Sequence, residues 1–389
     1  MDSTVYDYAI VGAGAAGLHL AMAMSNDKFF DSKKIVILEK SQKELNDKTW
    51  CFWEKGAGKW DGIATKIWEQ AQFMATDQQI DLNMGDYRYK MLASLDFYTY
   101  TKTELKNKEN ITWVNAEVGN ITQGETNTIE TNGQSYMANH VFDSIISPEF
   151  FKSKDKYTRL LQHFKGWVIE ADEEVFDEKS FVMMDFRITV PNTTCFTYVL
   201  PINSKKALIE FTFFSPALVE DESYENLLSR YVKEILQIEK YQILTKEKGV
   251  IPMSDYPFHK ENNQYLTKIG TAGGWVKPAS GYSFKNAERY SQRIVSNIKN
   301  NRSPSHKLLN TLFRKYDVLF IDVLYHHNNL GVGLFETMYS KNEAHRILAF
   351  LDEETTRAEE FKIINSFSPW PFMRALFKKL FLTWGRVKR

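Results

Sequence analysis

The first forty residues alternate between apolar and polar segments in the order strand, turn, helix, strand. Residues 8–12 form a short apolar run, a glycine-rich turn follows to residue 17, and residues 18–24 are almost wholly apolar. A second apolar run at 34–38 ends in an acidic residue. Short apolar runs bounded by turn residues are typical of buried strands, so the pattern predicts two strands joined by a helix.

Beyond residue 39 the regular repeat of strand and helix stops, and the pattern is mainly that of strands. Residues 47–53, which are first polar and then aromatic, are predicted to form a loop. Residues 111–144 are predicted to form a small set of strands, a β excursion, that leaves the parallel sheet and returns to it at 141–143. Alternating strands are then predicted at 166–170, 181–190, 195–200 and 207–214. The remaining predicted elements are a helix at 224–238, a strand at 265–269, a glycine-rich loop, a helix from residue 284 and further helices to the C-terminus.

The first turn carries three glycines with the spacing of a dinucleotide-binding motif. Gly12 permits the tight turn, Gly14 lets the backbone approach a pyrophosphate, and Gly17 allows the helix to pack closely on the strand. The phosphates would lie at the helix N-terminus beside Ala15 and Ala16, where backbone N–H groups favour anions. A chance glycine turn is the alternative, and the elements around the motif argue against it.

An acidic residue lies where such a motif requires one. Glu39 ends the second strand 22 residues after Gly17, so it can hydrogen-bond the adenosine ribose, with Lys40 beside it. An acid at this position disfavours a 2′-phosphate. We therefore expect FAD or NAD in this part of the chain rather than NADP.

The order of elements predicts an α/β protein in which a nucleotide-binding sheet is interrupted by an antiparallel sheet. This layout resembles that of glutathione-reductase-type flavoproteins related to aromatic hydroxylases. We expect a discontinuous FAD-binding Rossmann domain at 1–75, 100–165 and 262–300. An inserted antiparallel-sheet substrate domain would cover 76–99 and 166–261, followed by a C-terminal helical region at 301–389.

Composition narrows the class of protein. The 49 basic residues balance the 49 acidic ones, so charge gives no argument for a nucleic-acid partner. Two cysteines provide no disulfide framework or zinc site, which fits a reducing cytoplasm. The N-terminus lacks a basic region, and no stretch approaches 18 apolar residues, so we expect neither a signal peptide nor a membrane-spanning helix. The aromatic content of 14% indicates either a large apolar cavity or an aromatic-rich core.

The segment 270–283, GTAGGWVKPASGYS, resembles the G-x-x-G-x-x-x-x-P-x-[ST]-G-Y loop of bacterial and plant lycopene β-cyclases. Other segments similar to that family occur in the expected order, and together they span about residues 5–290. They are DKTWCFW at 47–53, QHFKG at 162–166, MDFR at 184–187, YVLP at 198–201, EFT at 210–212 and GVIPM at 249–253.

This resemblance implies a non-redox flavoenzyme. Members of the family cyclise the ψ-ends of lycopene to β-ionone rings, giving β-carotene through γ-carotene, with reduced FAD and with NADPH as reductant. Such a reaction needs an acid that protonates an alkene, surroundings that stabilise the carbocation, and a base that removes a ring proton. The resemblance also implies that Thr49, Trp50 and Ser283 contact the cofactor.

Glu210 is the strongest candidate for the acid. It lies in the apolar run ALIEFTFF at 207–214 and occupies the glutamate position of the family's short acidic motif, whose second acid is replaced here by Phe211. In a strand, Glu210 shares one face with Leu208 and Thr212. Burial would keep its carboxyl protonated near neutrality. The alternative is that this face is the wet side of the sheet.

The glycine-rich loop departs from the family at Lys277, where many members have a histidine with a proposed acid–base role. Lys277 either stabilises anionic reduced FAD or is exposed to solvent. Thr271 replaces an aspartate that binds the ribityl chain in related flavoproteins. The backbone N–H groups of Ala272, Gly273 and Gly274 are then candidates to hold the pyrophosphate or the flavin.

Asp185 is a further candidate in the site, and it lies on one face of a strand with Arg187. The two are expected to pair, either structurally or at the wall of the pocket. His326 and His327 have no acidic or cysteine cluster at metal spacing, so no metal site is expected. Candidates for a substrate tunnel and for cation–π stabilisation, with core packing as the alternative, are Trp50, Trp53, Tyr198, Phe213, Trp275 and Tyr282.

The C-terminal segment 370–389 is basic and strongly apolar. On a helix, the apolar side chains at 372, 376 and 380 would lie on one stripe together with Thr383. The apolar residues at 373, 377 and 384 would widen this stripe. Positive charge comes from Arg374, Lys378, Lys379 and Arg386. Such a helix either lies in an anionic membrane surface or docks on the body of the protein. Because a carotenoid dissolves only in lipid, we expect a cytoplasmic protein bound peripherally to the inner face of the membrane.

Two other functions remain open. The first is an FAD-dependent monooxygenase or prenyl reductase acting on a lipophilic substrate with the same fold. Such enzymes would be expected to keep the aspartate that Thr271 replaces. The second is a flavin- or lipid-binding protein without catalysis.

Overall fold

The computed structural model describes residues 4–153 and 155–387, with side chains as far as residue 379. Its first sheet is built around parallel strands in the order β8 (Ile111–Asn115), β2 (Ile35–Glu39), β1 (Val5–Val11) and β11 (Ser135–Asp143). Strand β17 (Leu266–Lys268) pairs in parallel with β11, so the chain returns to this sheet after a long excursion. Antiparallel strands β10 (Asn127–Thr131) and β9 (Val118–Thr122) extend the other edge, which confirms the predicted excursion.

Two helices pack together beside this sheet. Helix α1 (Ala15–Ser25) follows the glycine turn and contacts α5 (Phe284–Lys299), while α2 (Ser94–Leu105) packs against α1. Nearly all of α1 is buried, which explains why its sequence is apolar all round rather than on one stripe. The short helix α3 (Pro148–Lys152) follows β11.

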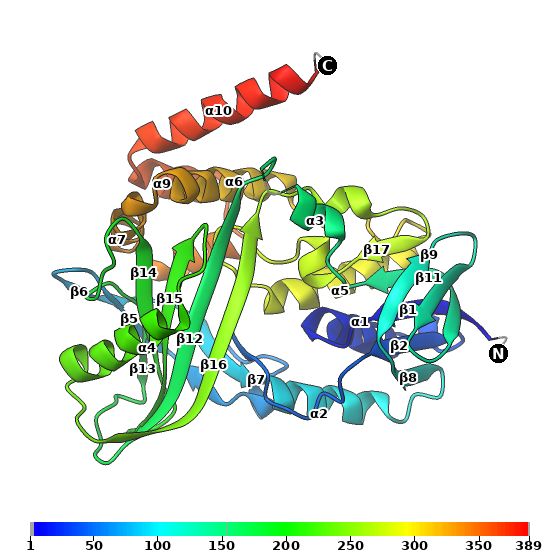
Figure 1. Cartoon of the computed structure of the whole chain (residues 1–389), viewed down its shortest axis with the longest axis horizontal. Helices are drawn as coiled ribbons and strands as arrows, with labels where there is room; N and C mark the ends of the chain where they lie inside the picture. Colours follow the sequence, from blue (N-terminus) through cyan, green and yellow to red (C-terminus); the bar gives the residue numbers. More distant parts are fainter. Residues whose placement is uncertain (1–3, 154, 388–389) are drawn as a thin grey trace.

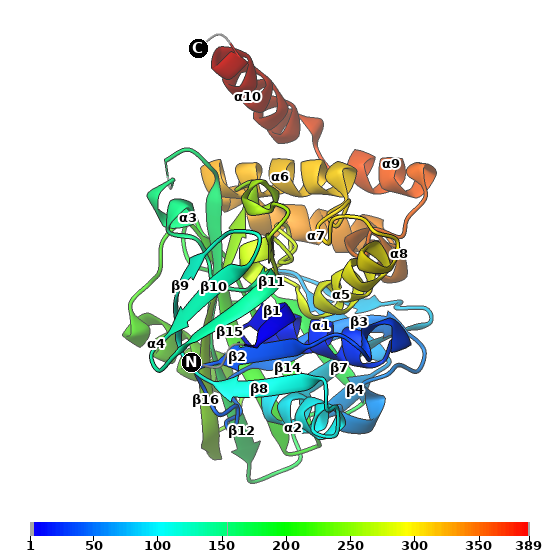
Figure 2. The ribbon, with the colours of Figure 1, turned by 90° about the vertical axis from the view of Figure 1, so that its right-hand side faces the viewer.

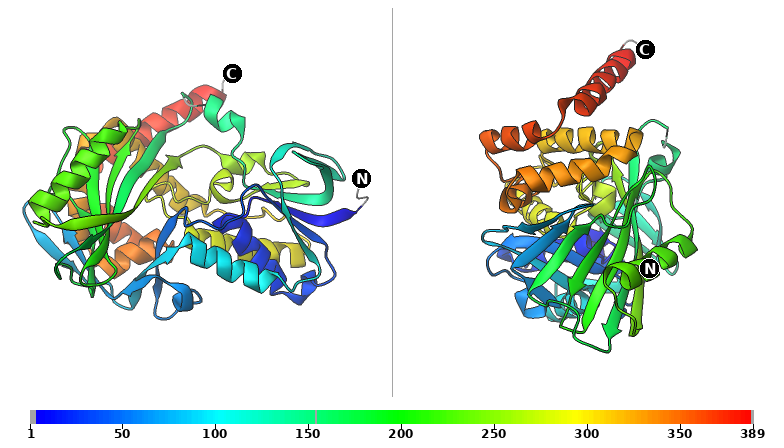
Figure 3. Two further views of the ribbon diagram at one scale, coloured as in Figure 1. Left: turned by 60° about the horizontal axis from the view of Figure 1, so that its bottom comes forward. Right: turned by 90° about the vertical axis from the view of Figure 1, so that its left-hand side faces the viewer.

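The second sheet has seven strands in the order β16 (Tyr241–Ser254), β12 (Arg159–Ala171), β15 (Lys206–Ser215), β14 (Thr194–Pro201), β13 (Ser180–Asp185), β5 (Gln70–Met74) and β6 (Gln79–Leu82). All neighbours are antiparallel except β5 and β13. Helix α4 (Asp221–Arg230) and the turn Tyr231–Ile235 pack on one face of this sheet. The two large sheets lie at opposite ends of the molecule (Figure 1; Figure 3).

Strand pairing corrects three predictions about this region. Residues 47–53 were expected as a loop, but most of them belong to β3 (Thr49–Lys55). Strand β7 (Tyr87–Ala93) provides β3 with a partner along its whole length and also pairs with β4 (Lys66–Trp68). Strand β5 belongs to the second sheet although it precedes the expected boundary at residue 75, and β12 joins it at 159 rather than 166. Strand β16 was not predicted.

Five helices end the chain: α6 (Thr311–His326), α7 (Gly331–Lys341), α8 (Ala344–Leu351), α9 (Arg357–Ser366) and α10 (Pro369–Val387). Helices α6 to α9 gather along one side of the molecule, and α10 lies outside them and contacts α6 (Figure 1; Figure 2). None of the described helices is long and apolar enough to cross a membrane.

Candidate active site

Two of the three glycines of the first turn have a steric reason for being glycine within the chain itself. Gly12 has φ of +93°, and a Cβ there would lie 2.1 Å from Oγ of Ser144. A Cβ on Gly17 would lie 1.9 Å from the carbonyl oxygen of Gly12, so α1 packs directly on the turn. A Cβ on Gly14 would meet nothing within 4 Å. The backbone at Gly14 is therefore open for the close approach of a ligand.

Glu39 is buried beside this turn. Its Oε2 accepts a hydrogen bond of 2.7 Å from the N–H of Ala13, and its Oε1 accepts one of 2.9 Å from the N–H of Ser41. Its carboxylate thus reaches the glycine turn, as the motif requires. Lys40 points elsewhere, because it is exposed and pairs with Glu117.

The glycine-rich loop begins with a 3₁₀ turn at Gly270–Gly273. The N–H of Gly273 donates to the carbonyl of Ile269, and the N–H of Gly274 donates to that of Thr271. These two N–H groups are used inside the turn, which corrects the expectation that they hold the cofactor. The N–H of Ala272 has no such partner among the backbone bonds of the described chain, so its prediction stands untested.

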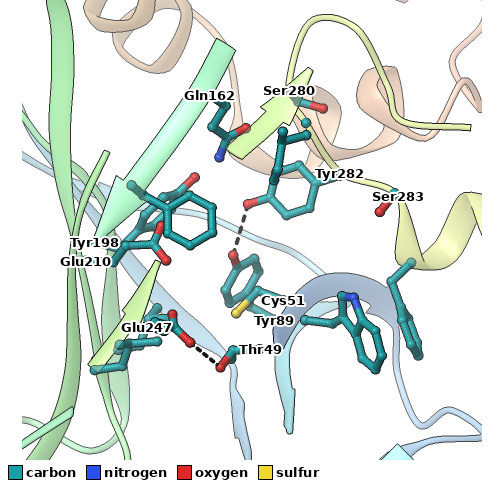
Figure 4. Close-up of a pocket in the computed structure, with 17 residues that line it drawn as sticks. Thr49, Cys51, Tyr89, Gln162, Tyr198, Glu210, Glu247, Ser280, Tyr282 and Ser283 are labelled. Carbon is teal, nitrogen blue, oxygen red and sulfur yellow. Dashed lines mark hydrogen bonds between the residues drawn. The ribbon is translucent and has the colours of Figure 1, made fainter. Parts of the chain in front are cut away.

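The later part of this loop forms one wall of a hollow of about 110 Å³ (Figure 4). The opposite wall is the second sheet, and β3 and β7 supply the floor. The residues around the hollow are Thr49, Trp50, Cys51, Tyr89, Gln162, Phe164, Tyr198, Leu200, Leu208, Glu210, Glu247, Ile251, Ser280, Gly281, Tyr282, Ser283 and Phe284. The structure thus gathers Glu210, Thr49, Trp50 and Ser283 from the predicted residues.

Glu210 faces the hollow together with Leu208, while Ile209, Phe211 and Phe213 pack on the α4 side of the sheet. The predicted division of the strand into two faces is confirmed, and the alternative of a wet outer face for Glu210 is wrong. Burial, followed by the charge of Glu247, raises the pKa of Glu210 well above its usual range. The hydroxyl of Thr212 donates a 2.9 Å hydrogen bond to Glu210 Oε1 and opposes this rise in pKa only in part.

Glu247 is the functional candidate that sequence reasoning missed. It projects from β16 into the same hollow, and its Oε2 accepts a 2.7 Å hydrogen bond from the hydroxyl of Thr49 (Figure 4). Burial raises the pKa of Glu247, whereas the hydrogen bonds from Thr49 and Glu210 lower it. A glutamate between Lys246 and Lys248 gave no signal of burial.

Tyrosines surround the acidic pair. Tyr89 and Tyr282 share a hydrogen bond of 2.9 Å between their hydroxyl groups, and Tyr198 is the cross-strand neighbour of Glu210 (Figure 4). Burial raises the pKa of Tyr198 well above its usual range. These rings therefore stay neutral and present aromatic faces beside the carboxyl group.

A larger apolar cavity of about 490 Å³ adjoins the hollow. The two spaces share Tyr198, Ser280 and Tyr282. Apart from these residues, the cavity is enclosed by Trp53, by Met183 and Met184 of β13, and by side chains of α6 to α10. The acidic hollow therefore adjoins a larger, mainly apolar space.

The predicted aromatic candidates divide into two groups. Four line one of the two spaces, namely Trp50, Trp53, Tyr198 and Tyr282. Phe213 instead packs on His163 and Tyr224 on the α4 side, and Trp275 packs against Tyr290. For these two, the alternative of core packing is the one observed.

Lys277 is buried, so its predicted exposure to solvent is wrong. Its ammonium lies 3.0 Å from Asp317 of α6 and 3.5 Å from Glu353. It does not line the hollow that contains Glu210. The carboxylates around it offset the loss of hydration and raise the pKa of Lys277, so it ties the glycine-rich loop to the C-terminal helices.

Asp185 pairs with Arg187 as expected, through a bidentate contact at 3.0 and 2.5 Å. The hydroxyl of Tyr231 also donates to it at 2.5 Å, and Tyr231 packs on the α4 side of the sheet. Asp185 therefore faces away from Glu210. Its pairing with Arg187 is structural, which is one of the two expected possibilities, and does not place it at the wall of the pocket. No group of His, Cys, Asp and Glu in the described part of the chain could hold a metal ion.

Comparison with solved structures defines the class of fold. A geranylgeranyl bacteriochlorophyll reductase-like protein of Thermoplasma acidophilum superposes with a TM-score of 0.60 at 12% identity, covering 95% of this chain and 98% of that one. The flavin-dependent brominase Bmp2 gives 0.63 at 11%, covering 92% and 97%. Halogenase PltM, solved with phloroglucinol and FAD, gives 0.56 at 12%, covering 94% and 87%. The chain thus has the α/β fold of these flavoproteins.

The sequence also identifies the family. The family described as lycopene cyclase protein matches residues 7–377, which is nearly the whole chain. The chain therefore belongs to the lycopene cyclase family, as its motifs indicate. A comparison with curated protein sequences finds no match.

Proposed function

We propose that this protein is a lycopene β-cyclase that converts the ψ-ends of lycopene to β-ionone rings, giving β-carotene through γ-carotene. The observation that carries the proposal is a half-buried glutamate of raised pKa, Glu210, in the hollow beside the glycine-rich loop. Its cross-strand neighbour Tyr198 lines both this hollow and the adjoining apolar cavity of about 490 Å³. A neutral carboxyl group beside an apolar space can protonate an alkene.

FAD is the cofactor that we propose, with NADPH as its reductant. The open backbone at Gly14, the N-terminus of α1 and the carboxylate of Glu39 fit its adenosine and pyrophosphate. In the hollow, the buried Oε1 of Gln162 and Oγ of Ser280 have no hydrogen-bond partner in the described chain. Buried polar groups normally find partners, so these atoms fit a polar ligand such as a flavin ring.

The chain's own residues account for the remaining steps. Glu210 would donate its proton to the terminal alkene, and the faces of Tyr198 and Tyr282 would stabilise the carbocation. The apolar walls exclude water that would otherwise trap the cation. The Glu210 carboxylate is then placed to remove a ring proton. Reduced FAD, when bound, supplies negative charge beside the cation.

The α9–α10 surface suggests how a polyene reaches the cavity. We define this surface as the exposed side chains Phe361, Ile364, Trp370, Met373, Leu376 and Phe377, which are 41–73% exposed. Three of them also line the cavity, namely Ile364, Met373 and Leu376. The apolar interior thus reaches the outside at this surface. Exposed Arg374 lies beside it.

We propose that this surface lies in the cytoplasmic face of the membrane and admits the substrate from the bilayer. An exposed apolar patch with a basic residue is suited to an anionic lipid surface. Part of the predicted stripe, at residues 380, 383, 384 and 386, lies outside the described side chains. The alternative, that this helix docks on the body of the protein, is what Lys379 shows, because Lys379 pairs with Asp255 and Asp322.

Expression in bacteria that accumulate lycopene tests the function. The expected result is conversion to β-carotene, detected by chromatography of extracted pigments, with no conversion by the Glu210→Gln variant. Unchanged lycopene in the presence of folded, flavin-loaded protein would contradict the proposal. A product with added oxygen or altered hydrogen content would favour the monooxygenase or prenyl reductase alternative.

A further inference from the structure

Glu210 and Glu247 stand in one row across three strands of the second sheet. Gly166 of β12 is the register partner of Glu210 on β15 and also of Glu247 on β16. Adjacent strands are about 4.8 Å apart, so the backbones of the two glutamates are separated by about 10 Å. Two glutamate side chains can close this gap only when the position between them leaves room.

Gly166 leaves that room. A Cβ on it would lie 2.9 Å from Cγ and 3.2 Å from Oε1 of Glu247, and 3.0 Å from Cδ1 of Leu208. The side chain of Glu247 therefore leans across the bare backbone of Gly166 toward Glu210. Both carboxyl groups therefore face the same hollow, and each lies near enough to alter the pKa of the other. A hydrogen bond between two carboxyl groups requires a proton on one of them, because an ionised carboxylate only accepts.

The surroundings assign that proton to Glu210. The interaction of the two glutamates raises the pKa of Glu210, first through the charge of Glu247, and lowers the pKa of Glu247. The hydroxyl of Thr49 donates to Glu247 at 2.7 Å and favours its ionised form. The pair therefore holds one proton between two carboxyl groups, with Glu247 as the anion.

Among the described residues, no other charged group lies beside the two glutamates in the hollow. No Lys, Arg or His belongs to the described lining of the hollow. The titratable groups that face the pair from β3, β7, β14 and the loop are neutral near pH 7, because burial raises the pKa of each: Cys51, Tyr89, Tyr198 and Tyr282. The nearby lysines pair on the α4 side of the sheet with Asp221 and Glu225; they are Lys165, Lys246 and Lys248.

We infer that Glu247 is a positioning residue for the acid: as the ionised member of a one-proton pair, it keeps the proton on Glu210 until the substrate takes it. This inference rests on the proposed role of Glu210 as the acid. In the first step the O–H bond of Glu210 breaks and the electron pair of the alkene forms a C–H bond. Two carboxylates then lie side by side, and return of a ring proton to Glu210 relieves their repulsion. The proton count is restored, and no oxidant or reductant is consumed.

The pH profile of cyclisation by the purified full-length protein with reduced FAD tests this role. In Glu247→Gln the neighbouring negative charge is gone, so Glu210 ionises at lower pH and the alkaline limb moves down. We expect about tenfold less activity than wild type at pH 8 and recovery at pH 6. In Thr49→Val the anion loses a donor, and the limb should move to higher pH.

Glu225→Gln is the matched control, because Glu225 belongs to α4 and pairs with Lys165 and Lys246 on the opposite face. Its profile should coincide with that of wild type. A Glu247→Gln profile that also coincides with wild type would overturn the inference. So would a uniform loss at every pH, which indicates a structural role. The opposite shift in Thr49→Val keeps the test decisive when Glu247→Gln folds poorly.

Infrared difference spectroscopy reads the proton without requiring cyclisation. The C=O band of a protonated carboxyl group should be present at pH 7 in wild type and absent in Glu210→Gln. In Glu247→Gln the same band should titrate away at lower pH. If lycopene is not cyclised but the band behaves in this way, the proposed function fails and the one-proton pair stands. If lycopene is cyclised without this band, the pair fails alone.

Discussion

The buried ion pair of Lys277 offers a test of how the C-terminal helices are held. The ammonium is 4% exposed, and its partners Asp317 and Glu353 are 5% and 11% exposed. Removing one partner of a buried pair costs about 3–5 kcal/mol, because a charge is left without a counter-charge. We therefore expect Lys277→Met to lower the free energy of unfolding by that amount. For a chain of 389 residues, the Tm should fall by about 4–6 °C.

The measurement is thermal and urea unfolding of Lys277→Met beside two further variants. Lys55→Met is the matched control, because Lys55 and its partner Glu354 are 57% and 56% exposed, and such pairs contribute less than about 1 kcal/mol. The double variant Lys277→Met/Asp317→Leu replaces the pair by apolar groups and should recover most of the loss. Glu353 keeps Arg289 at 3.7 Å in that variant.

Two results would refute this reasoning. The first is a decrease in the free energy of unfolding of Lys277→Met that is no larger than that of Lys55→Met. The buried pair would then not stabilise the fold. The second is a double variant with restored stability and no cyclase activity. Lys277 would then act in the reaction rather than as the tie between the loop and α6.

Four further outcomes are expected. Glu210→Gln should lower cyclisation by about 10²–10⁴-fold while FAD still binds, measured by pigment analysis and flavin absorbance. Gly166→Ala should displace the side chain of Glu247 and shift the pH profile in the same direction as Glu247→Gln, with unfolding as the control. Burial raises the pKa of Asp352 to about 7, so it contributes stability below its usual pKa that is lost as pH rises through 7; Asp352→Asn should remove this decline, of at most about 3 kcal/mol between pH 5 and pH 8, in unfolding at those two pH values. Trp370, 73% exposed on α10, should contribute about 1–2 kcal/mol to binding of anionic phospholipid vesicles, so Trp370→Ala should sediment with them about tenfold less.

Controls separate these effects from general damage. Leu208 borders Gly166, so Leu208→Ala shows whether space alone near the pair changes the profile. Phe29→Ala removes an exposed aromatic ring far along the chain from α10 and should leave vesicle binding unchanged. A pH-independent stability of the wild type between pH 5 and pH 8 would contradict the reasoning on Asp352.

Local sequence predicted much of the nucleotide-binding part. The glycine turn, α1 and the strand ending in Glu39 follow from short-range patterns, since each element is largely specified by its own residues. Residues 47–53 were predicted as a loop, which is wrong for 49–53, because their strand depends on pairing with β7, more than 30 residues later. Strand β16 was missed because the three charged residues at 246–248 interrupt its apolar pattern.

The same distinction applies to the site. Glu210 could be found because a carboxylate in an apolar strand is unusual within a few residues of sequence. Glu247 could not, because its proximity to Glu210 depends on register across β12 and on the missing side chain of Gly166. The partners of Lys277 come from α6 and from the segment after α8, and no local pattern connects them to the loop.

The central claim is an acid-catalysed cyclisation by Glu210 without net redox change. Its most direct test is turnover of lycopene by purified protein with reduced FAD in D₂O, followed by mass spectrometry of the pigment. The account predicts an isomer of lycopene that carries one deuterium for each ring formed, because the proton of Glu210 exchanges with solvent between turnovers, and no such product from Glu210→Gln. A product without deuterium, or one that has gained oxygen or two hydrogens, would contradict it.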